Sequence, residues 1–278
     1  MNRKAVFLDI DGTLANDRGV VPDSAREAVR RARANGHLMF VCTGRSLAEL
    51  WDHIMDVGFD GVIAAAGGYV EVAGEVLLHV NVPVPDVLRV VEFFDAHDVQ
   101  YFLEANSGLY GSPHLKERLH ELVFAGVTDD TILAELERGI GPFIDTLIVG
   151  ADPARDDINK ISFLDSGVGL DEVRERFGVT FTLIPATVPV FGPNSGELSI
   201  PGVHKADAIQ VVLDHLGIDV ADTLGYGDGH NDLEMLQHVA VGVAMGNAVP
   251  ELLAVADEVT GTADEDGLRA SFTAHGLV

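Results

Sequence analysis

Short runs of consecutive apolar residues constrain the fold of this chain more than any other feature of its sequence. They occur at 5–10, 37–42 and 62–66 and lack the polar alternation of a half-exposed strand. Strands that are buried on both faces of a parallel sheet lose that alternation. Helical patterns at 24–34 and 46–57 separate the runs, so the order strand, helix, strand, helix predicts an α/β domain with a parallel sheet.

The order of the elements changes in the middle of the chain. A hairpin is predicted at 69–80, around Ala73-Gly74-Glu75. From Pro83 onward, helical and strand-like patterns are mixed in a way that is typical of an α+β module. The helical patterns lie at 84–97, 114–124, 131–138 and 170–176, and the strand-like ones at 99–104, 146–150, 161–165, 179–184 and 197–200.

After Pro201 the alternation of the first region returns. The predicted helices are 205–216, 232–238 and 249–256, and the predicted strands are 223–226 and 239–244. We therefore predict a Rossmann-like parallel sheet core with helices on both faces, formed by 1–82 and 201–278. Residues 83–200 form an inserted α+β domain, in which the Pro- and Gly-rich segment 185–196 is a candidate hinge or strand connection.

Charge and composition exclude several classes of function. The 278 residues include 44 Asp and Glu against 18 Lys and Arg, a formal net charge of −26. A nucleic-acid-binding surface needs clustered basic side chains, so we expect no nucleic-acid partner. We interpret the acid excess as a solvated surface rather than as salt adaptation.

The N-terminus and the cysteine content bear on the compartment. The apolar stretch Ala5–Leu8 is too short for the core of a secretion signal, and no run approaches the ~18–20 apolar residues of a membrane span. Cys42 is the single cysteine, which excludes an internal disulfide and a Cys-based metal cluster. We expect a cytoplasmic protein with no membrane partner.

The first candidate motif is Asp9-Ile10-Asp11-Gly12-Thr13-Leu14, at the C-terminal end of the first predicted strand. Ligands of open α/β sheets bind at the carboxyl ends of the strands. Asp9 and Asp11 would point to opposite faces of a regular strand, so both serve one site only if the chain bends, which Gly12 allows. A surface turn with Asx hydrogen bonds is the alternative.

Two further motifs suit an anion. Thr43-Gly44-Arg45 follows a predicted strand and leads into a predicted helix, whose free N–H groups favour phosphate. Ser46 capping that helix is the alternative. Lys205 opens the first helix after the insertion, where its ammonium would offset the charge of a phosphate, or else lie along the surface.

The fourth motif is Gly227-Asp228-Gly229-His230-Asn231-Asp232, at the end of the strand predicted at 223–226. Asp228 and Asp232 supply carboxylate oxygens, which Mg²⁺ prefers, and they could complete a cation site that begins with Asp9. The glycine spacing partly imitates a dinucleotide fingerprint, but the last glycine of that pattern is missing.

Together, the four motifs resemble those of the haloacid dehalogenase (HAD) superfamily, and the placement of the insertion resembles Cof-like members with a type IIB cap. Met245-Gly246-Asn247-Ala248 and Glu265-Asp266-Gly267 also resemble the C-terminal pattern of that subfamily. The sequence departs from the pattern after the third strand, where Ala64-Ala65-Ala66-Gly67-Gly68 replaces a common Asn-Gly. We therefore expect a polar group near the pocket to be missing, which weakens a substrate preference taken from relatives.

The resemblance implies a Mg²⁺-dependent phosphatase that acts on a small phosphorylated metabolite such as a sugar phosphate. Asp9 would be the nucleophile that forms an aspartyl-phosphate, and Asp11 the general acid and base. Thr43, Gly44, Arg45, Lys205 and Asn231 would bind the phosphoryl group, and Asp9, Asp11, Asp228 and Asp232 would form the metal site.

Several alternatives stay open at this point. A phosphosugar mutase or phosphotransferase would use the same Asp9 intermediate, and a non-catalytic phosphate-binding or regulatory module would use none. The sequence is compatible with a monomer or a homodimer. Glu104, Asn106, Tyr110, Asn194 and Glu197 of the insertion are candidates for contact with the leaving group.

Overall fold

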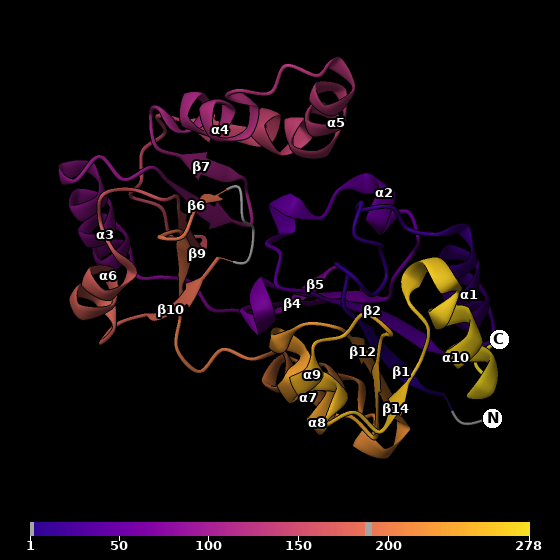
Figure 1. Cartoon of the computed structure of the whole chain (residues 1–278). Helices are drawn as coiled ribbons and strands as arrows, with labels where there is room; N and C mark the ends of the chain where they lie inside the picture. Colours follow the sequence, from indigo (N-terminus) through magenta and orange to yellow (C-terminus); the bar gives the residue numbers. More distant parts are fainter. Residues whose placement is uncertain (1–2, 187–190) are drawn as a thin grey trace. The chain divides into compact units, whose positions relative to one another are not determined.

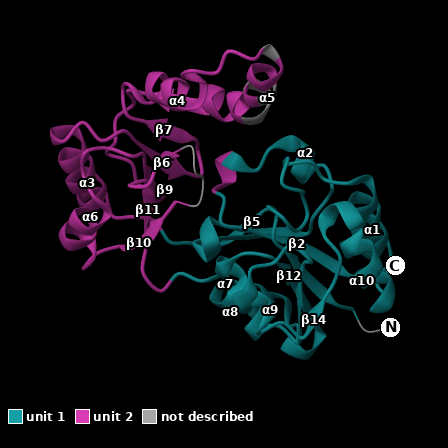
Figure 2. Ribbon diagram, viewed as in Figure 1, with its two compact units in different colours: residues 1–45, 49–80, 203–278 teal, residues 46–48, 81–202 magenta. Residues whose placement is uncertain are grey.

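The computed structural model describes residues 3–186 and 191–278. Two compact units make up the chain (Figure 2). Residues 1–45, 49–80 and 203–278 form unit 1, and residues 46–48 and 81–202 form unit 2. The chain thus leaves unit 1 after Val80 and returns to it at Val203, so that most of unit 2 is one continuous insertion.

In the described part of unit 1, eight strands form one sheet in the order β14-β13-β12-β1-β2-β3-β4-β5 (Figure 1). Strands β14 through β3 run parallel, and β4 and β5 complete the sheet as an antiparallel hairpin. The strands are β1 (Ala5–Leu8), β2 (Leu38–Cys42), β3 (Gly61–Ala64), β4 (Tyr69–Val72), β5 (Glu75–His79), β12 (Thr223–Gly227), β13 (Val241–Ala244) and β14 (Glu258–Val259).

Helices cover both faces of this sheet. On one face, α7, α8 and α9 pack with Phe7 and Phe40 in a buried apolar cluster. On the other face, α10 packs on β12, where the hydroxyl groups of Tyr226 and Ser271 lie 2.9 Å apart, and α1 contacts α10. The helices are α1 (Asp23–Ala34), α2 (Asp52–Met55), α7 (Lys205–Leu216), α8 (Leu233–His238), α9 (Pro250–Leu253) and α10 (Gly267–Ala274).

The helix predicted at 46–57 is wrong. The chain forms a single 3-10 turn at Leu47–Glu49, an extended Trp51, and the short helix α2. The extended backbone of Trp51, with φ −71° and ψ 154°, interrupts the helical hydrogen-bond pattern, and Arg45 Nη1 donates to the carbonyl oxygen of Glu49 just before it at 3.2 Å.

Unit 2 contains the second sheet, which has six strands among the residues described, in the order β10-β11-β9-β6-β7-β8. Its pairs are antiparallel except for β7 with β8. The strands are β6 (Tyr101–Ala105), β7 (Leu109–Gly111), β8 (Leu147–Val149), β9 (Ile158–Phe163), β10 (Thr182–Pro185) and β11 (Gly196–Ser199). The helices are α3 (Val84–Ala96), α4 (Leu115–Phe124), α5 (Asp130–Thr146) and α6 (Leu170–Phe177).

Two apolar clusters hold unit 2 together. Phe94 of α3 and Phe177 of α6 pack with Leu103 and Phe163 of the sheet, whereas Leu115 of α4 belongs to a second cluster with other residues of the sheet. The predicted α/β core with an inserted α+β domain is confirmed.

Two predicted segments of unit 2 differ from the observed ones. The helix expected at 131–138 starts one residue earlier, where Asp129 caps it by accepting from Thr131 and Ile132, and continues to Thr146 through Pro142. Part of the predicted connection 185–196, namely 187–190, lies outside the described residues. No helix in the described ranges is both long and apolar enough to cross a membrane.

Candidate active site

The topology of unit 1 brings three of the four motifs to one edge of the sheet. Strands β12, β1 and β2 are parallel neighbours, so their carboxyl ends lie side by side. Asp9 follows β1, Thr43 follows β2 and Asp228 follows β12. The sequence-predicted residues therefore converge where open α/β sheets bind ligands.

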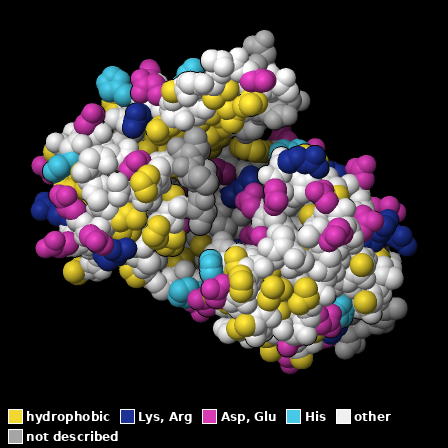
Figure 3. All heavy atoms as spheres, in the orientation of Figure 1, with side chains coloured by type: hydrophobic (Ala, Val, Ile, Leu, Met, Phe, Trp, Pro, Cys, Tyr) yellow, Lys and Arg dark blue, Asp and Glu magenta, His cyan; other side chains and the backbone are white. Residues whose placement is uncertain are grey.

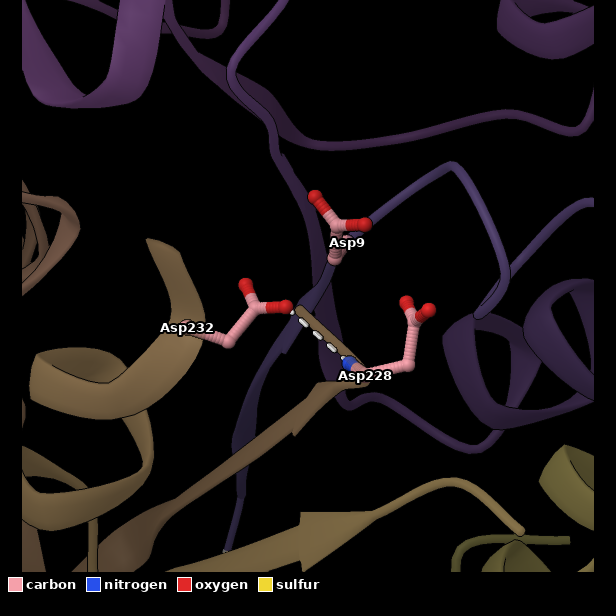
Figure 4. Close-up of side chains that lie close together, drawn as sticks. All are labelled: Asp9, Asp228 and Asp232. Atoms are coloured by element: carbon pink, nitrogen blue, oxygen red, sulfur yellow. Dashed lines mark hydrogen bonds between the residues drawn. The ribbon is translucent and has the colours of Figure 1, made fainter. Parts of the chain in front are cut away.

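Three carboxylates lie together at this edge. Asp9, Asp228 and Asp232 each offer an oxygen within 4.8 Å of the others' oxygens. Figure 4 shows their side chains turned to the same region from the end of β1, the end of β12 and the turn that follows it. Asp9 is 5% and Asp232 0% exposed. Such crowding of buried negative charge calls for a neighbouring cation.

Lys205 supplies one positive charge in this cluster. Its buried Nζ donates to Asp9 Oδ1 at 2.7 Å and to Asp232 Oδ1 at 2.5 Å. The start of α7 is fixed by the turn after β3, because a Cβ added to Gly67 would lie 2.3 Å from the carbonyl oxygen of His204. The close approach at Gly67 thus places the helix whose first residue is Lys205.

Asp232 also organises the loop after β12. Its Oδ2 accepts from the backbone N–H groups of Asp228 and Gly229, both at 3.0 Å. One of these bonds is the dashed line in Figure 4. Both oxygens of Asp232 are therefore engaged within the protein, and its carboxylate holds Asp228 in place.

Two residues without a predicted role hold Asp228. Thr13 Oγ1 donates to Asp228 Oδ1 at 2.9 Å, and Asn247 Nδ2 donates to Asp228 Oδ2 at 3.1 Å. Asn247 Nδ2 also donates to the carbonyl oxygen of Gly12 at 3.1 Å. Both residues lie in motifs that the sequence singles out, but only the folded chain shows that they fix a carboxylate.

The anion motif after β2 meets the loop after β12. Thr43 is buried, and its Oγ1 accepts from the backbone N–H of Arg45 at 3.2 Å. A Cβ on Gly44 would lie 3.2 Å from Asn231 Nδ2, so the side chain of Asn231 lies over Gly44. The structure thus brings together Thr43, Gly44 and Asn231. The sequence predicts all three as phosphate ligands.

Arg45 and Asp11 form a separate pair. Arg45 Nε donates to Asp11 Oδ2 at 2.8 Å and Nη2 to Asp11 Oδ1 at 2.6 Å. The guanidinium also lies 5.3 Å from the centre of the Trp51 ring. Neither side chain belongs to the cluster around Asp9, although both are predicted members of the site.

The electrostatics of the cluster suit a divalent cation. Burial and the neighbouring charge of Asp232, against the lowering effect of Lys205, raise the pKa of Asp9 to about 8. Burial also raises the pKa of Asp228 to about 6, although the hydrogen bond from Thr13 lowers it. Burial lowers the pKa of Lys205, but the negative charges of Asp232 and Asp9 raise it by more. The pKa of Lys205 therefore lies above its ordinary value. These oxygen donors fit a hard divalent ion.

Two of the candidate residues in unit 2 also surround a lysine. Lys160 Nζ lies 3.3 Å from Glu104 Oε2 and 2.6 Å from Glu197 Oε2. Ser162 Oγ donates to Glu104 Oε1 at 2.6 Å. These four residues, on β6, β9 and β11, form a polar patch on the sheet of unit 2, which we call the Lys160 patch.

The other three candidates of unit 2 make separate contacts. Asn106 Oδ1 accepts from Asn159 Nδ2 at 2.8 Å, and the guanidinium carbon of Arg155 lies 3.8 Å from the centre of the Tyr110 ring. Asn194 lies in the segment between β10 and β11. The structure therefore does not gather all five candidates into one group.

A comparison with protein families identifies the family of this chain. The family model described as haloacid dehalogenase-like hydrolase matches residues 6–271, which includes all four motifs. The chain belongs to the haloacid dehalogenase-like hydrolases. The resemblance noted in the sequence is thereby confirmed.

The similarity to related proteins covers the whole length of this hydrolase. YkrA of Bacillus subtilis (strain 168) is 28% identical over 284 residues, which cover 100% of both chains. The 5-amino-6-(5-phospho-D-ribitylamino)uracil phosphatase YitU of the same organism is 24% identical and covers 95% of this chain and 94% of its own. The HAD subclass IIB sugar phosphatase BT4131 has a TM-score of 0.72 at 25% identity, over 99% of this chain and 100% of its own.

These comparisons place this haloacid dehalogenase-like hydrolase among the Cof-like members and identify it as a phosphatase. The acidic cluster at the end of β1 is where a hydrolase of this family would bind a divalent metal ion.

Proposed function

We propose that the protein is a Mg²⁺-dependent phosphatase that hydrolyses small phosphorylated metabolites, most of all sugar phosphates, through an aspartyl-phosphate on Asp9. One observation carries the proposal: Asp9 lies at the end of β1 with Lys205 bound to its Oδ1, beside Asp228 and Asp232. Lys205 orients the carboxylate, and we assign Oδ2 as the attacking oxygen.

The residues act in two half-reactions. In the first, Asp9 forms a bond to phosphorus while the bond to the leaving oxygen breaks, and Asp11 gives its proton to that oxygen. In the second, Asp11 takes a proton from a water molecule that attacks the phosphorus, and phosphate leaves with Asp9 restored. Thr43, the Gly44 amide, Lys205 and Asn231 hold the phosphoryl oxygens as charge shifts.

We assign Mg²⁺ to Asp9, the backbone carbonyl of Asp11 and Asp228. When bound, it offsets the repulsion between the carboxylate and the anionic phosphate. We assign Asp232 the role of holding Lys205 and the loop of Asp228 in place rather than that of a metal ligand. Its oxygens already accept from Lys205 and from two backbone amides.

We assign substrate selection to the inserted unit, as a cap domain. The Lys160 patch offers two carboxylates and an ammonium group, which suit the hydroxyl groups of a sugar. The sugar phosphatase BT4131, similar over the full length of the chain, supports this substrate class.

The remaining predictions concern location and partners. We propose a cytoplasmic enzyme, monomeric or homodimeric, that binds no nucleic acid. The net charge of −26 and the acidic side chains on the face of unit 1 shown in Figure 3 support the last point, because they repel a polyanion.

Release of inorganic phosphate tests the proposed function. We would measure phosphate from p-nitrophenyl phosphate and from a panel of sugar phosphates, with Mg²⁺, with EDTA, and with Asp9→Asn. The exposed Asp17→Asn is the matched control. We expect metal-dependent release that Asp9→Asn abolishes and Asp17→Asn retains.

Other outcomes would point elsewhere. Activity that survives Asp9→Asn would contradict the nucleophile. Conversion of a sugar phosphate to its isomer without release of phosphate would indicate a mutase, and phosphate binding without turnover would indicate a regulatory module.

A further inference from the structure

One turn of unit 1 lies outside the four motifs but contacts two of them. Residues 65–68, which we call the β3 turn, connect β3 to β4. Because β3 is parallel to β2, the turn lies at the carboxyl edge of the sheet, next to the end of β2. The sequence departs from the Cof-like pattern in this segment, and the proposed mechanism gives it no role.

The first contact is with the anion motif after β2. Ala66 N donates to the carbonyl oxygen of Thr43 at 3.0 Å, and Ala65 N donates to that of Arg45 at 2.7 Å. The backbone N–H of Thr43 donates to Ile63 O of β3 at 2.9 Å. Both backbone groups of Thr43 are therefore bound to β3 and its turn, which fixes where the side chain of this buried residue lies.

The second contact is with the helix that begins at Lys205. A Cβ added to Gly67 would lie 2.3 Å from the carbonyl oxygen of His204 and 3.2 Å from Lys205 N. Only a residue without a side chain allows this approach, and the φ of +108° also favours glycine. The same turn thus contacts the backbone of two predicted phosphate ligands, Thr43 and Lys205.

The backbone of the β3 turn is strained. Ala65 and Ala66 have φ of 50° and 55°, in the left-handed region that alanine rarely adopts. Strained backbone persists only where the surrounding structure imposes it, and it is concentrated at functional sites. In this turn, the hydrogen bonds from the two alanine amides to the anion motif hold the strained conformation. The strain therefore accompanies the contact that holds Thr43.

From these contacts we infer that the β3 turn is a positioning element. Ala66 acts through Thr43 and Gly67 acts through Lys205, so that one turn keeps two phosphate ligands in place relative to each other. The inference rests on the proposed function, in which both ligands hold the phosphoryl group. It gives the turn itself no contact with the substrate.

The experiment compares Ala66→Val with Ala73→Val. Ala73 has φ of 50°, is exposed and lies between β4 and β5, so a β-branched residue strains both positions. We expect both variants to lower the midpoint of thermal unfolding. Only Ala66→Val should lower kcat/KM for p-nitrophenyl phosphate, by about 10²-fold, which is the cost of a displacement of about 1 Å at a reacting site. It should also raise the Ki of inorganic phosphate about tenfold, as expected for one impaired hydrogen bond to a charged group.

Two further variants show whether Ala66 acts through Thr43. Ala66→Gly allows the left-handed backbone, so this conservative variant should retain the phosphate affinity that Ala66→Val loses. The double variant Thr43→Val/Ala66→Val should lose no more than Thr43→Val alone. If Ala66→Val does not fold, Ala66→Leu lacks the branch at Cβ and should give a smaller loss in the same direction, with Ala73→Leu as its control.

A matched pair of glycines tests the contact with Lys205. Gly67→Ala brings a Cβ against the His204 carbonyl, whereas Gly74, between β4 and β5, has φ +84° and no atom within 4 Å of such a Cβ. We expect Gly67→Ala to weaken phosphate binding and Gly74→Ala to leave it unchanged. The double variant Gly67→Ala/Lys205→Met should lose no more than Lys205→Met alone.

Three results would overturn the inference. They are equal effects of Ala66→Val and Ala73→Val on kcat/KM and Ki, a loss in Ala66→Gly as large as that in Ala66→Val, and additive losses in the double variants.

The failure of this inference is distinguishable from failure of the proposed function. Wild-type turnover that Asp9→Asn abolishes, together with β3-turn variants that behave like their controls, removes only the role of the turn. Turnover that Asp9→Asn leaves intact removes the proposed mechanism itself.

Discussion

Two of the four lysines of the chain lie between pairs of carboxylates, one in each unit, and they differ in ways that separate chemistry from recognition. Lys205 has a fully buried side chain, at the first residue of α7, and binds Asp9 and Asp232. Lys160 lies within β9 with a side chain 17% exposed, beside Glu104 and Glu197. In the proposed function, the buried lysine at the start of a helix belongs to the reacting site, and the lysine on the sheet of unit 2 belongs to a surface for substrate contacts.

Replacing each lysine by methionine should give the largest contrast. Lys205→Met removes the partner of two buried carboxylates, which costs about 3–5 kcal/mol of unfolding free energy. It also removes a phosphate ligand, so we expect kcat/KM to fall by about 10²–10³-fold. Lys160→Met should leave p-nitrophenyl phosphate turnover near the wild-type value and raise KM for sugar phosphates. Steady-state kinetics and thermal unfolding measure both effects, and equal losses for the two variants would contradict the distinction.

Two glycines with a positive φ, one in each unit, allow a second comparison of the two units. Gly12 has φ +81°, and a Cβ there would lie 2.2 Å from Asp228 Oδ2. Gly150 of unit 2 has φ +70° and no atom within 4 Å of such a Cβ. We expect Gly12→Ala to displace Asp228 and weaken Mg²⁺ binding by about 100-fold or more. Gly150→Ala should cost only about 1–2 kcal/mol of backbone strain.

Calorimetric titration with Mg²⁺ and thermal unfolding would separate these two effects. Unchanged Mg²⁺ affinity in a folded Gly12→Ala variant would show that Asp228 is not a ligand of the ion.

A hydroxyl holds a carboxylate in each unit, which allows a second matched pair. Thr13 donates to Asp228 and Ser162 donates to Glu104. Removing a group that orients a metal ligand typically costs about 10–100-fold in affinity, so Thr13→Val should weaken Mg²⁺ binding by that amount. Thr13→Ser should retain the affinity, and Ser162→Ala should not change it. A loss of Mg²⁺ affinity in Ser162→Ala would contradict the proposal that the ion binds in unit 1.

The pH dependence of metal binding follows from the raised pKa values in unit 1. Asp228, with a pKa of about 6, and Asp9, with a pKa of about 8, must release protons before they bind Mg²⁺. The apparent affinity for Mg²⁺ should therefore rise with pH, by up to about tenfold per pH unit for each proton released. Titration calorimetry in buffers of different ionisation enthalpy counts the protons, and a pH-independent affinity would show that these carboxylates are already ionised.

The same groups set the stability of the metal-free protein. A carboxylate whose folded pKa is raised favours folding at low pH and loses that contribution as pH rises through the folded value. Without metal, the free energy of unfolding should fall as pH rises from the ordinary carboxyl pKa of 3.8, until about pH 6 for the contribution of Asp228 and until about pH 8 for that of Asp9, and then level off. Saturating Mg²⁺ should reverse this fall, because it binds the folded state.

Some of this site is readable from the sequence and some is not. Apolar runs predict parallel strands, and the polar residues that follow them, such as Asp9 and Asp228, must meet at one edge because the strand ends do. Lys205 is predictable as the first residue of a helix. These inferences depend on local pattern and on the general topology of such sheets.

The contacts of long side chains are not readable in that way. Arg45 reaches Asp11, 34 positions away in the chain, and Asn247 reaches Gly12 from 235 positions away. The left-handed Ala65 and Ala66, with φ of 50° and 55°, are equally unexpected, because alanine rarely adopts this backbone. Tertiary hydrogen bonds from these two amides to the carbonyls of Arg45 and Thr43 stabilise the turn.

The close approach of Gly67 to His204 has a mechanical consequence. The chain returns from the long insertion to unit 1 at 202–203, and this return leads directly to the start of α7. Backbone packed against backbone at His204 clamps the chain between the insertion and Lys205. The position of Lys205 relative to Asp9 is therefore set by contacts within unit 1 and does not depend on the chain that precedes Val203.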